Sequence, residues 1–177
     1  MSIVIELSGV EKSFGKQKVL DGIDLTVEAG TTLVIVGASG QGKSVILKHM
    51  LGLMKPDAGT VRVFGQDLSR LKRDELKEVR RDFCVLVQGA ALLDSLTVYE
   101  NVALPLRERT TLSEKEIADR VHDRLELMDL ENVDEKFPAQ LSGGMRKRVG
   151  LARALTLEPK VVFFDEPTTG LDVHKSN

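Results

Sequence analysis

The chain has 177 residues, which is enough for one domain with an inserted subdomain. Apolar residues make up 42% of it, charged residues 29%, and the formal net charge is −2. This composition is typical of a globular protein with no overall attraction to nucleic acid, and we expect no nucleic-acid partner. The single cysteine, Cys84, excludes an internal disulfide. The sequence has neither a secretory signal nor an apolar run of roughly 20 residues, so we expect a cytoplasmic chain.

Short segments in the N-terminal third predict β-strands. Residues 3–8 and 23–27 alternate apolar and polar side chains, and residues 60–65 follow a turn at residues 56–59. Residues 33–36, Leu-Val-Ile-Val, are continuously apolar and predict a short buried strand. We therefore expect a small antiparallel layer beside a parallel core.

A glycine-rich turn follows that apolar segment. Its order of Gly, four residues, Gly, Lys and Ser is the P-loop pattern, and a predicted helix at residues 45–51 comes next. Backbone N–H groups of such a turn, with the positive end of the helix dipole, bind phosphates. The candidate phosphate-binding residues are Gly37, Ala38, Ser39, Gly40, Gln41, Gly42, Lys43, Ser44 and Val45.

The middle of the chain is predicted to be mostly helical. Residues 70–81 are charged and helix-prone, and residues 83–87 form an apolar strand. Ser113 and Glu116 make a capping box that opens a further helix. The apolar residues on one face of that helix should be buried: Ile117, Val121, Leu125 and Met128. Residues 92–139 therefore predict a helical insertion between core strands.

A second helix start suited to anions lies at the beginning of residues 141–155. Ser142 can cap this helix, and Gly143 and Gly144 leave its first N–H groups uncovered. Because one nucleotide needs one such site, the second site favours a nucleotide held mainly by another copy of the chain. An ordinary helix cap is the alternative.

Two adjacent carboxylates, Asp165 and Glu166, end the predicted strand at residues 161–164. In P-loop enzymes an acid at this place holds Mg²⁺ together with the P-loop hydroxyl, here Ser44. The acid that follows can accept a proton from an attacking water.

Taken in order, these motifs resemble the ATP-binding subunit of an ABC transporter. The motifs are the P-loop, Gln88 after a strand, Leu141 to Gly144, Val161 to Glu166, and Thr169 to Asp172. The resemblance implies an α/β P-loop NTPase (RecA-like) core with a small N-terminal antiparallel β layer, an inserted α-helical subdomain and the last core strands missing. Residues 1–177 would be one incomplete nucleotide-binding domain, with its core at residues 1–89 and 156–177 and a helical signature subdomain at residues 90–155.

The resemblance also implies site residues within a head-to-tail homodimer that binds ATP and Mg²⁺. The implied catalytic residues are Lys43, Gln88 and Glu166, and the implied metal ligands are Ser44, Gln88 and Asp165. Phe14 would stack on adenine, with core packing as the alternative for a lone aromatic residue. The implied residues at the dimer seam are Ser142, Gly143 and Gly144, which would bind the γ-phosphate of the opposite subunit, and Asp172.

Residues 88–102 and 141–149 are similar to the Mla/Mce-associated subfamily of these ATPases. Met145 supports this, because most ABC proteins place Gln there. That subfamily energises the movement of phospholipids or other hydrophobic compounds across a bacterial envelope. The resemblance implies membrane permease subunits docking near residues 88–101, an MCE-type lipid-binding subunit, and a peripheral position on the inner face of the cell membrane.

The family continues beyond this last motif with a helix, a strand and a switch histidine. The sequence ends at Asn177, and His174 is too close to Asp172 to be that histidine. We therefore expect a C-terminally truncated cassette that binds ATP but hydrolyses it poorly. Two further hypotheses are a non-catalytic nucleotide-binding fragment and a soluble ABC ATPase of translation or DNA repair.

Overall fold

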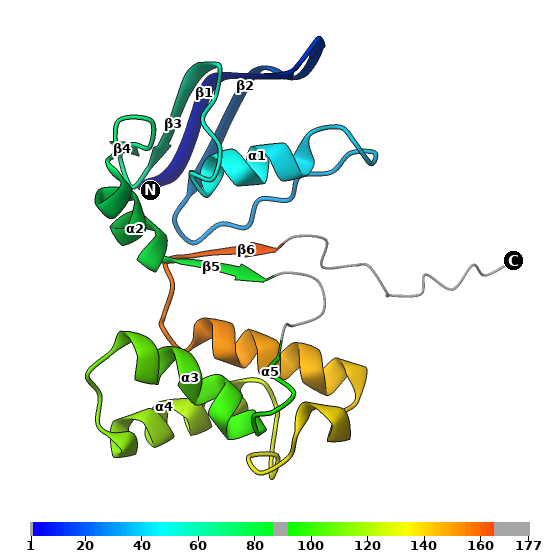
Figure 1. Cartoon of the computed structure of the whole chain (residues 1–177), viewed down its shortest axis with the longest axis vertical. Coiled ribbons are helices and arrows are strands. Elements are labelled where there is room, and N and C mark those ends of the chain that lie inside the picture. Colours follow the sequence, from blue (N-terminus) through cyan, green and yellow to red (C-terminus); the bar gives the residue numbers. More distant parts are fainter. Residues whose placement is uncertain (1, 87–91, 165–177) are drawn as a thin grey trace, which may run out of the picture. The chain divides into compact units, whose positions relative to one another are not determined.

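The computed structural model describes residues 2–86 and 92–164, which belong to two compact units, residues 1–81 and 82–177 (Figure 1). The first unit contains a four-stranded antiparallel sheet, and the second a two-stranded parallel sheet with helices. Among the described residues, none of the helices combines the length and apolar character that crossing a membrane requires. The division predicted from the sequence, with a helical subdomain at residues 90–155, stays a prediction.

In the first unit, the alternating segments form a sheet in the order β2–β1–β3–β4. Its strands are β1 (Ile3–Phe14), β2 (Gln17–Glu28), β3 (Ala58–Val63) and β4 (Gln66–Asp67). In the register of β1 with β3, Ile5 lies opposite Val63. Leu7 lies opposite Val61 two residues further on, and all four side chains are buried. The predicted antiparallel layer is confirmed, and this apolar face holds it together.

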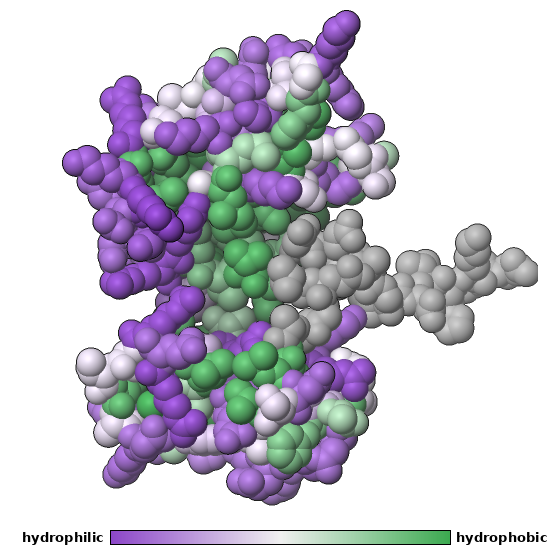
Figure 2. Space-filling model, viewed as in Figure 1, coloured by the Kyte–Doolittle hydropathy of each residue, from purple (hydrophilic) through white to green (hydrophobic). Residues whose placement is uncertain are grey.

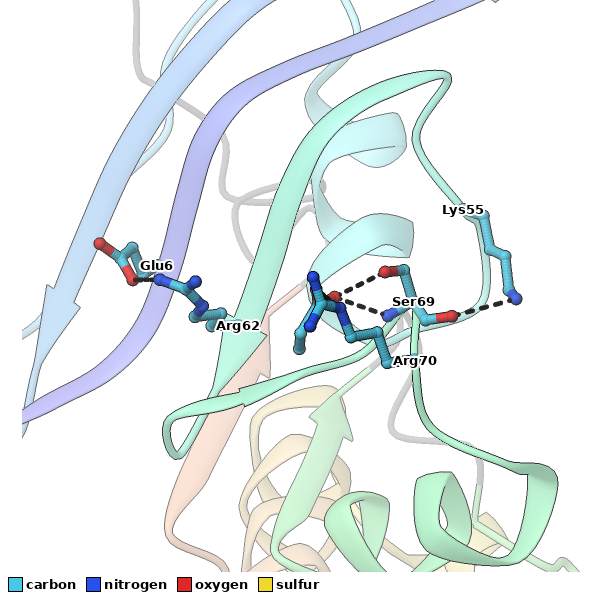
Figure 3. Close-up of polar contacts among 6 residues, drawn as sticks. Glu6, Lys55, Arg62, Ser69 and Arg70 are labelled. Carbon is cyan, nitrogen blue, oxygen red and sulfur yellow. Dashed lines mark hydrogen bonds and ion pairs between the residues drawn. The ribbon is translucent and has the colours of Figure 1, made fainter.

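The alternate positions of the same strands are polar. Arg62 of β3 lies beside Glu6 of β1, with 3.4 Å between guanidinium nitrogen and carboxylate oxygen (Figure 3). Asp67, the last residue of β4, accepts a hydrogen bond from the Ser69 hydroxyl and forms an ion pair with Arg70. Exposed ion pairs contribute only about 0–1 kcal/mol each. The sheet therefore depends mainly on its apolar face.

Two helices accompany this sheet. Helix α1 (Lys43–Met50) lies against β2 and β3, with Ile46 and His49 buried. Helix α2 (Arg73–Arg81) is almost wholly charged and buries Val79. Figure 2 shows hydrophilic side chains gathered over β4 and α2, as this composition leads one to expect.

The strand predicted at residues 33–36 is not present in the structure. Residues 31–38 form no strand, and the four apolar side chains are between 36% and 88% exposed. The physical reason lies in the residue pattern. A segment that is apolar at every position suits a parallel sheet covered on both faces, whereas the sheet of this unit is antiparallel and alternates. The parallel strands belong to the other unit.

In the second unit, the strands predicted near residues 83–87 and 161–164 form a parallel pair. Its elements are β5 (Phe83–Leu86), α3 (Val98–Arg109), α4 (Glu114–Leu127), a short 3₁₀ helix (Pro138–Gln140), α5 (Gly143–Leu155) and β6 (Val161–Phe164). The capping box of Ser113 and Glu116 opens α4 as predicted. The α4 stripe is buried at Ile117, Val121 and Leu125, and Met128 packs partly buried against the same core. Cys84 on β5 is half-buried, which raises the pKa of its thiol.

Candidate nucleotide-binding site

The predicted phosphate-binding turn leads directly into α1. Gly40 and Gly42 have left-handed backbones, with φ of 83° and 87°, while Gln41 between them does not. Such alternation turns successive backbone N–H groups toward one side, which is an arrangement that binds anions. Helix α1 has neither a side-chain cap nor an acidic residue in its first turn, so its own side chains do not neutralise its positive end.

Gly42 is the position in this turn that tolerates no side chain. A Cβ atom there would lie 3.0 Å from side-chain carbons of both Val19 and Leu20. A Cβ atom at Gly40 would meet nothing within 4 Å. The glycine at position 42 therefore lets the start of α1 approach β2 closely, and this contact fixes where the turn lies.

The Lys43 side chain folds over the beginning of the turn. Its Nζ donates to the carbonyl oxygens of Gly37 at 2.7 Å and Ala38 at 2.8 Å. A lysine ammonium has three N–H donors, so one remains without a partner among the described residues. The structure thus holds a cation at the phosphate-binding turn with one proton available for a phosphate oxygen.

The hydroxyl of Ser44 lies in the first turn of α1, and its residue is exposed. Within the described part of the chain, no group of three or more His, Cys, Asp or Glu residues could hold a metal ion. Mg²⁺ typically takes one or two protein oxygens and completes its shell with phosphate oxygens and water. A single hydroxyl beside a phosphate-binding turn fits that requirement, so the residues present suit a nucleotide triphosphate with Mg²⁺.

Phe14 ends β1 and is 47% exposed, so it does not pack in the core. The Nζ of Lys12 lies 5.9 Å from its ring centroid. That same ammonium is 2.6 Å from an Asp57 carboxylate oxygen, and the other oxygen accepts from the backbone N–H of Ser13 at 2.7 Å. The exposed ring is therefore carried on a strand end that a carboxylate holds in place.

The second predicted anion-binding helix start is formed as expected. Ser142 is the N-cap of α5 and accepts a hydrogen bond from the backbone N–H of Met145 at 3.2 Å. Gly143 and Gly144 are exposed, and the first turn contains no acidic residue. The guanidinium of Arg146 donates back to the carbonyl of Leu141, just before the helix, at 2.7 Å.

The structure brings together only part of the predicted site. Residues 37–45 form one continuous turn and helix start in the first unit, and Ser142, Gly143 and Gly144 form another in the second. Four predicted residues lie outside the described residues: Gln88, Asp165, Glu166 and Asp172. Their roles stay predictions.

Sequence reasoning missed three residues that support these elements. The sequence pattern places Asp57 in a turn. Its contacts with Lys12 and Ser13 of β1 join residues that are far apart in the chain. Arg80 donates to the carbonyls of Leu51 and Gly52 at the end of α1, at 2.9 and 2.7 Å. Asn101 is completely buried. The sequence offers one signal for Asn101, which is its position between Glu100 and an apolar run. An amide buried there requires hydrogen-bond partners.

Comparison with known proteins identifies the family. Residues 20–169 match the family model described as ABC transporter. The chain belongs to the ABC transporter family. It is 46% identical to the probable ribonucleotide transport ATP-binding protein mkl of Mycobacterium tuberculosis, over 97% of this chain and 48% of that protein. It is 42% identical to the protein TRIGALACTOSYLDIACYLGLYCEROL 3 of Arabidopsis thaliana, over 96% of this chain and 51% of that protein. The chain spans about half the length of the curated relatives it matches.

Solved ABC structures share this fold. The cbiO1 protein from Clostridium perfringens superposes with a TM-score of 0.88 at 28% identity, covering 97% of this chain and 68% of that one. A dimeric cassette, MJ0796, bound to ADP and Pi, superposes with a TM-score of 0.78 at 35% identity, covering 96% of this chain and 76% of that one. The predicted P-loop NTPase fold with its β layer and helical subdomain is confirmed. The ATPase class and the use of ATP with Mg²⁺ are confirmed at the level of the family.

Proposed function

We propose that this chain is the ATP-binding and hydrolysing subunit of an ABC transporter that moves phospholipid or another hydrophobic compound through a membrane permease. The observation that carries the proposal is the turn at residues 37–45, with Lys43 held over it and Gly42 packed against β2. Membership of the family gives that turn its ligand, ATP with Mg²⁺.

Each residue of the site has a distinct task in this proposal. Phe14 offers its exposed ring to adenine, and the N–H groups of the turn bind the phosphates. Mg²⁺, when bound, would neutralise charge that develops on the phosphates. Ser44 and Asp165 would be its protein ligands. Gln88 orients the attacking water, and Glu166 accepts its proton.

The second helix start supports a head-to-tail dimer. One chain offers two helix N-termini without an acidic residue in the first turn, at α1 and α5, and a nucleotide needs its phosphates bound mainly by one of them. In the proposed dimer, Ser142, Gly143 and Gly144 close over the nucleotide held by the P-loop of the other copy, with Asp172 at the seam. The solved cassette MJ0796 is described as dimeric, which supports this arrangement.

The proposed transporter places this chain on the inner face of the cell membrane. Permease subunits would dock near residues 88–101, where Leu93 is 45% exposed. The subfamily resemblance adds an MCE-type lipid-binding subunit to the proposed assembly.

Two observations on relatives bear on the transported compound. The Arabidopsis relative carries a galactolipid in its name, and residues 88–102 and 141–149 resemble the lipid-transport subfamily. The mycobacterial relatives are named for ribonucleotide transport, and others for methionine import. A hydrophobic compound is our first candidate, and a ribonucleotide is the second.

The test is transport by the complete complex, purified from its own host through a tag on this chain and reconstituted in lipid vesicles. We expect ATP to drive movement of a fluorescent phospholipid, and Lys43→Ala to abolish both this movement and ATP turnover. ATP turnover without phospholipid movement, but with uptake of a radiolabelled ribonucleotide, would replace the first candidate with the second. ATP binding without any turnover would favour the non-catalytic alternative.

A further inference from the structure

Asn101, in the first turns of α3, makes the densest set of side-chain hydrogen bonds among the described residues. Its side chain is fully buried. Its Oδ1 accepts from the backbone N–H of Leu93 at 2.8 Å. Its Nδ2 donates to the carbonyls of Leu93, Leu96 and Thr97 at 3.0, 3.0 and 2.9 Å. The two N–H groups of Nδ2 are shared among the three carbonyls while Oδ1 takes the N–H of Leu93, so an amide in this orientation suits its surroundings.

All of these partners belong to one short segment, the 93–97 loop, residues Leu93 to Thr97. Leu93, Asp94 and Ser95 are exposed, and the loop has one internal hydrogen bond, from the N–H of Leu96 to the carbonyl of Leu93 at 3.1 Å. The backbone groups of such exposed residues would otherwise bond to water. The buried amide therefore ties the loop at Leu93, Leu96 and Thr97 to α3.

Asn101 is also an unexpected residue at its position. Its neighbours along α3, Val98, Val102 and Ala103, are fully buried apolar residues of the core. An apolar residue at position 101 would suit this core, but it would remove the side-chain partner of the Leu93 N–H and of the Leu96 carbonyl. The chain thus has a polar group in its core, and all of the side-chain partners of that group lie in a surface loop.

The 93–97 loop comes shortly after Gln88 in the sequence and lies within the segment proposed to meet the permease. We propose that Asn101 is the positioning residue for coupling. Its amide fixes the 93–97 loop so that ATP turnover and the permease stay linked. The inference rests on the proposed function. All of the side-chain hydrogen bonds of Asn101 end in this loop, so it acts through the loop.

The first variant is Asn101→Asp, which keeps the shape of the side chain but removes its three donor interactions. In the reconstituted complex we expect transport per ATP hydrolysed to fall at least about fivefold, the factor that the loss of one net hydrogen bond gives. ATP affinity should be unchanged. Amide hydrogen exchange at residues 93–97 should become faster, which reports the loop directly.

Glu116→Ala is the matched control. Glu116 accepts from the N–H of Ser113 at 2.8 Å in the capping box that opens α4, in the same unit but outside residues 88–101, so its loss weakens a helix start away from the loop. All four side-chain bonds of Asn101 remain, and we expect the ratio of transport to turnover to stay as in the wild type. An equal fall in this ratio for both variants would show a general effect of helix stability in this unit and would overturn the inference.

A second variant covers the case in which Asn101→Asp does not fold. The double change Asp94→Gly and Ser95→Gly loosens the loop from its exposed side and leaves the core intact. It should lower the same ratio and speed the same exchange. Faster exchange in either variant with an unchanged ratio contradicts the proposal, as does unchanged exchange in Asn101→Asp. If the wild-type complex moves no phospholipid, the proposed function fails separately, and permease-dependent stimulation of ATP turnover replaces transport in the ratio.

Discussion

At the scale of single residues, the two glycines of the phosphate-binding turn differ in what they allow. Both have left-handed backbones, but only Gly42 has neighbours 3.0 Å from where a Cβ would lie. We expect Gly40→Ala to cost about 1 kcal/mol in the ligand-free protein, from the backbone alone. Gly42→Ala should cost about 1–3 kcal/mol more, because crowding is added to strain. Urea unfolding of both variants measures the difference, and equal losses would mean that this close approach is absent in solution.

The carboxylate of Asp57 gives a pH dependence to the strand end that carries Phe14. The hydrogen bond from Lys12, followed by that from the N–H of Ser13, lowers the pKa of Asp57 from its ordinary value of 3.8. A lowered pKa in the folded state means that the ionised form stabilises the fold. The contribution is therefore complete above the ordinary pKa and is lost as pH falls through the lower folded pKa.

Replacing Asp57 by Asn tests this sign. The wild type should be more stable than Asp57→Asn at neutral pH, and this difference should shrink below about pH 4. Unfolding by urea at a series of pH values gives the difference directly. A difference that grows toward low pH would contradict the assignment.

At the scale of elements, α2 braces the end of α1 that is remote from the phosphates. The Arg80 guanidinium donates to the carbonyls of Leu51 and Gly52, directly after α1, and Gly52 leaves room for Leu76 of α2, whose Cδ1 would be 2.8 Å from a Cβ there. A cation at a helix C-terminus also complements its dipole.

Variants of two neighbouring arginines, Arg80 and Arg81, distinguish the effect of this brace from that of an ordinary surface charge. Arg80→Ala should cost about 1.5–3 kcal/mol, the range for hydrogen bonds from a charged group. Arg81→Ala removes only an exposed pair with Glu78 on the same helix and should change stability by less than about 0.5 kcal/mol. Thermal unfolding of both variants measures this, and similar losses would mean that Arg80 does not brace α1.

The sequence predicted elements well where the information is local. Capping residues and apolar periodicity located α4 and α5, because Ser113 and Ser142 act on their own first turns. The prediction of a strand at residues 33–36 was wrong. Its apolar pattern indicates a strand covered on both faces but does not indicate which sheet would contain it. Asp57, Arg80 and Asn101 were missed for a related reason, as each stabilises a segment other than its own. The P-loop turn was predictable because its residue pattern is local and Lys43 finds its hydrogen-bond partners, Gly37 and Ala38, within the same turn.

At the scale of the whole molecule, the starts of α1 and α5, which both lack an acidic residue in the first turn, carry the proposed dimer. Gly144→Asp places a negative charge in the first turn of α5, where a Cβ meets nothing within 4 Å, so the fold should tolerate it. The charge favours the helix dipole but repels a phosphate. In the Glu166→Gln background we expect ATP to produce a dimer, and Gly144→Asp to abolish it while ATP binding by each chain remains. Sedimentation velocity with and without ATP measures this, and a persistent dimer would exclude α5 from the nucleotide.

The proposed function requires this chain to bind ATP through Lys43 and the turn that it covers. Calorimetric titration of the purified protein with ATP and Mg²⁺ tests this, alongside Lys43→Ala and the control Lys48→Ala, an exposed lysine of the same helix. We expect binding by the wild type and Lys48→Ala, and a loss of at least about tenfold in affinity for Lys43→Ala, the size of a charge-assisted hydrogen bond. Equal affinity in all three proteins, or none in the wild type, would contradict this expectation.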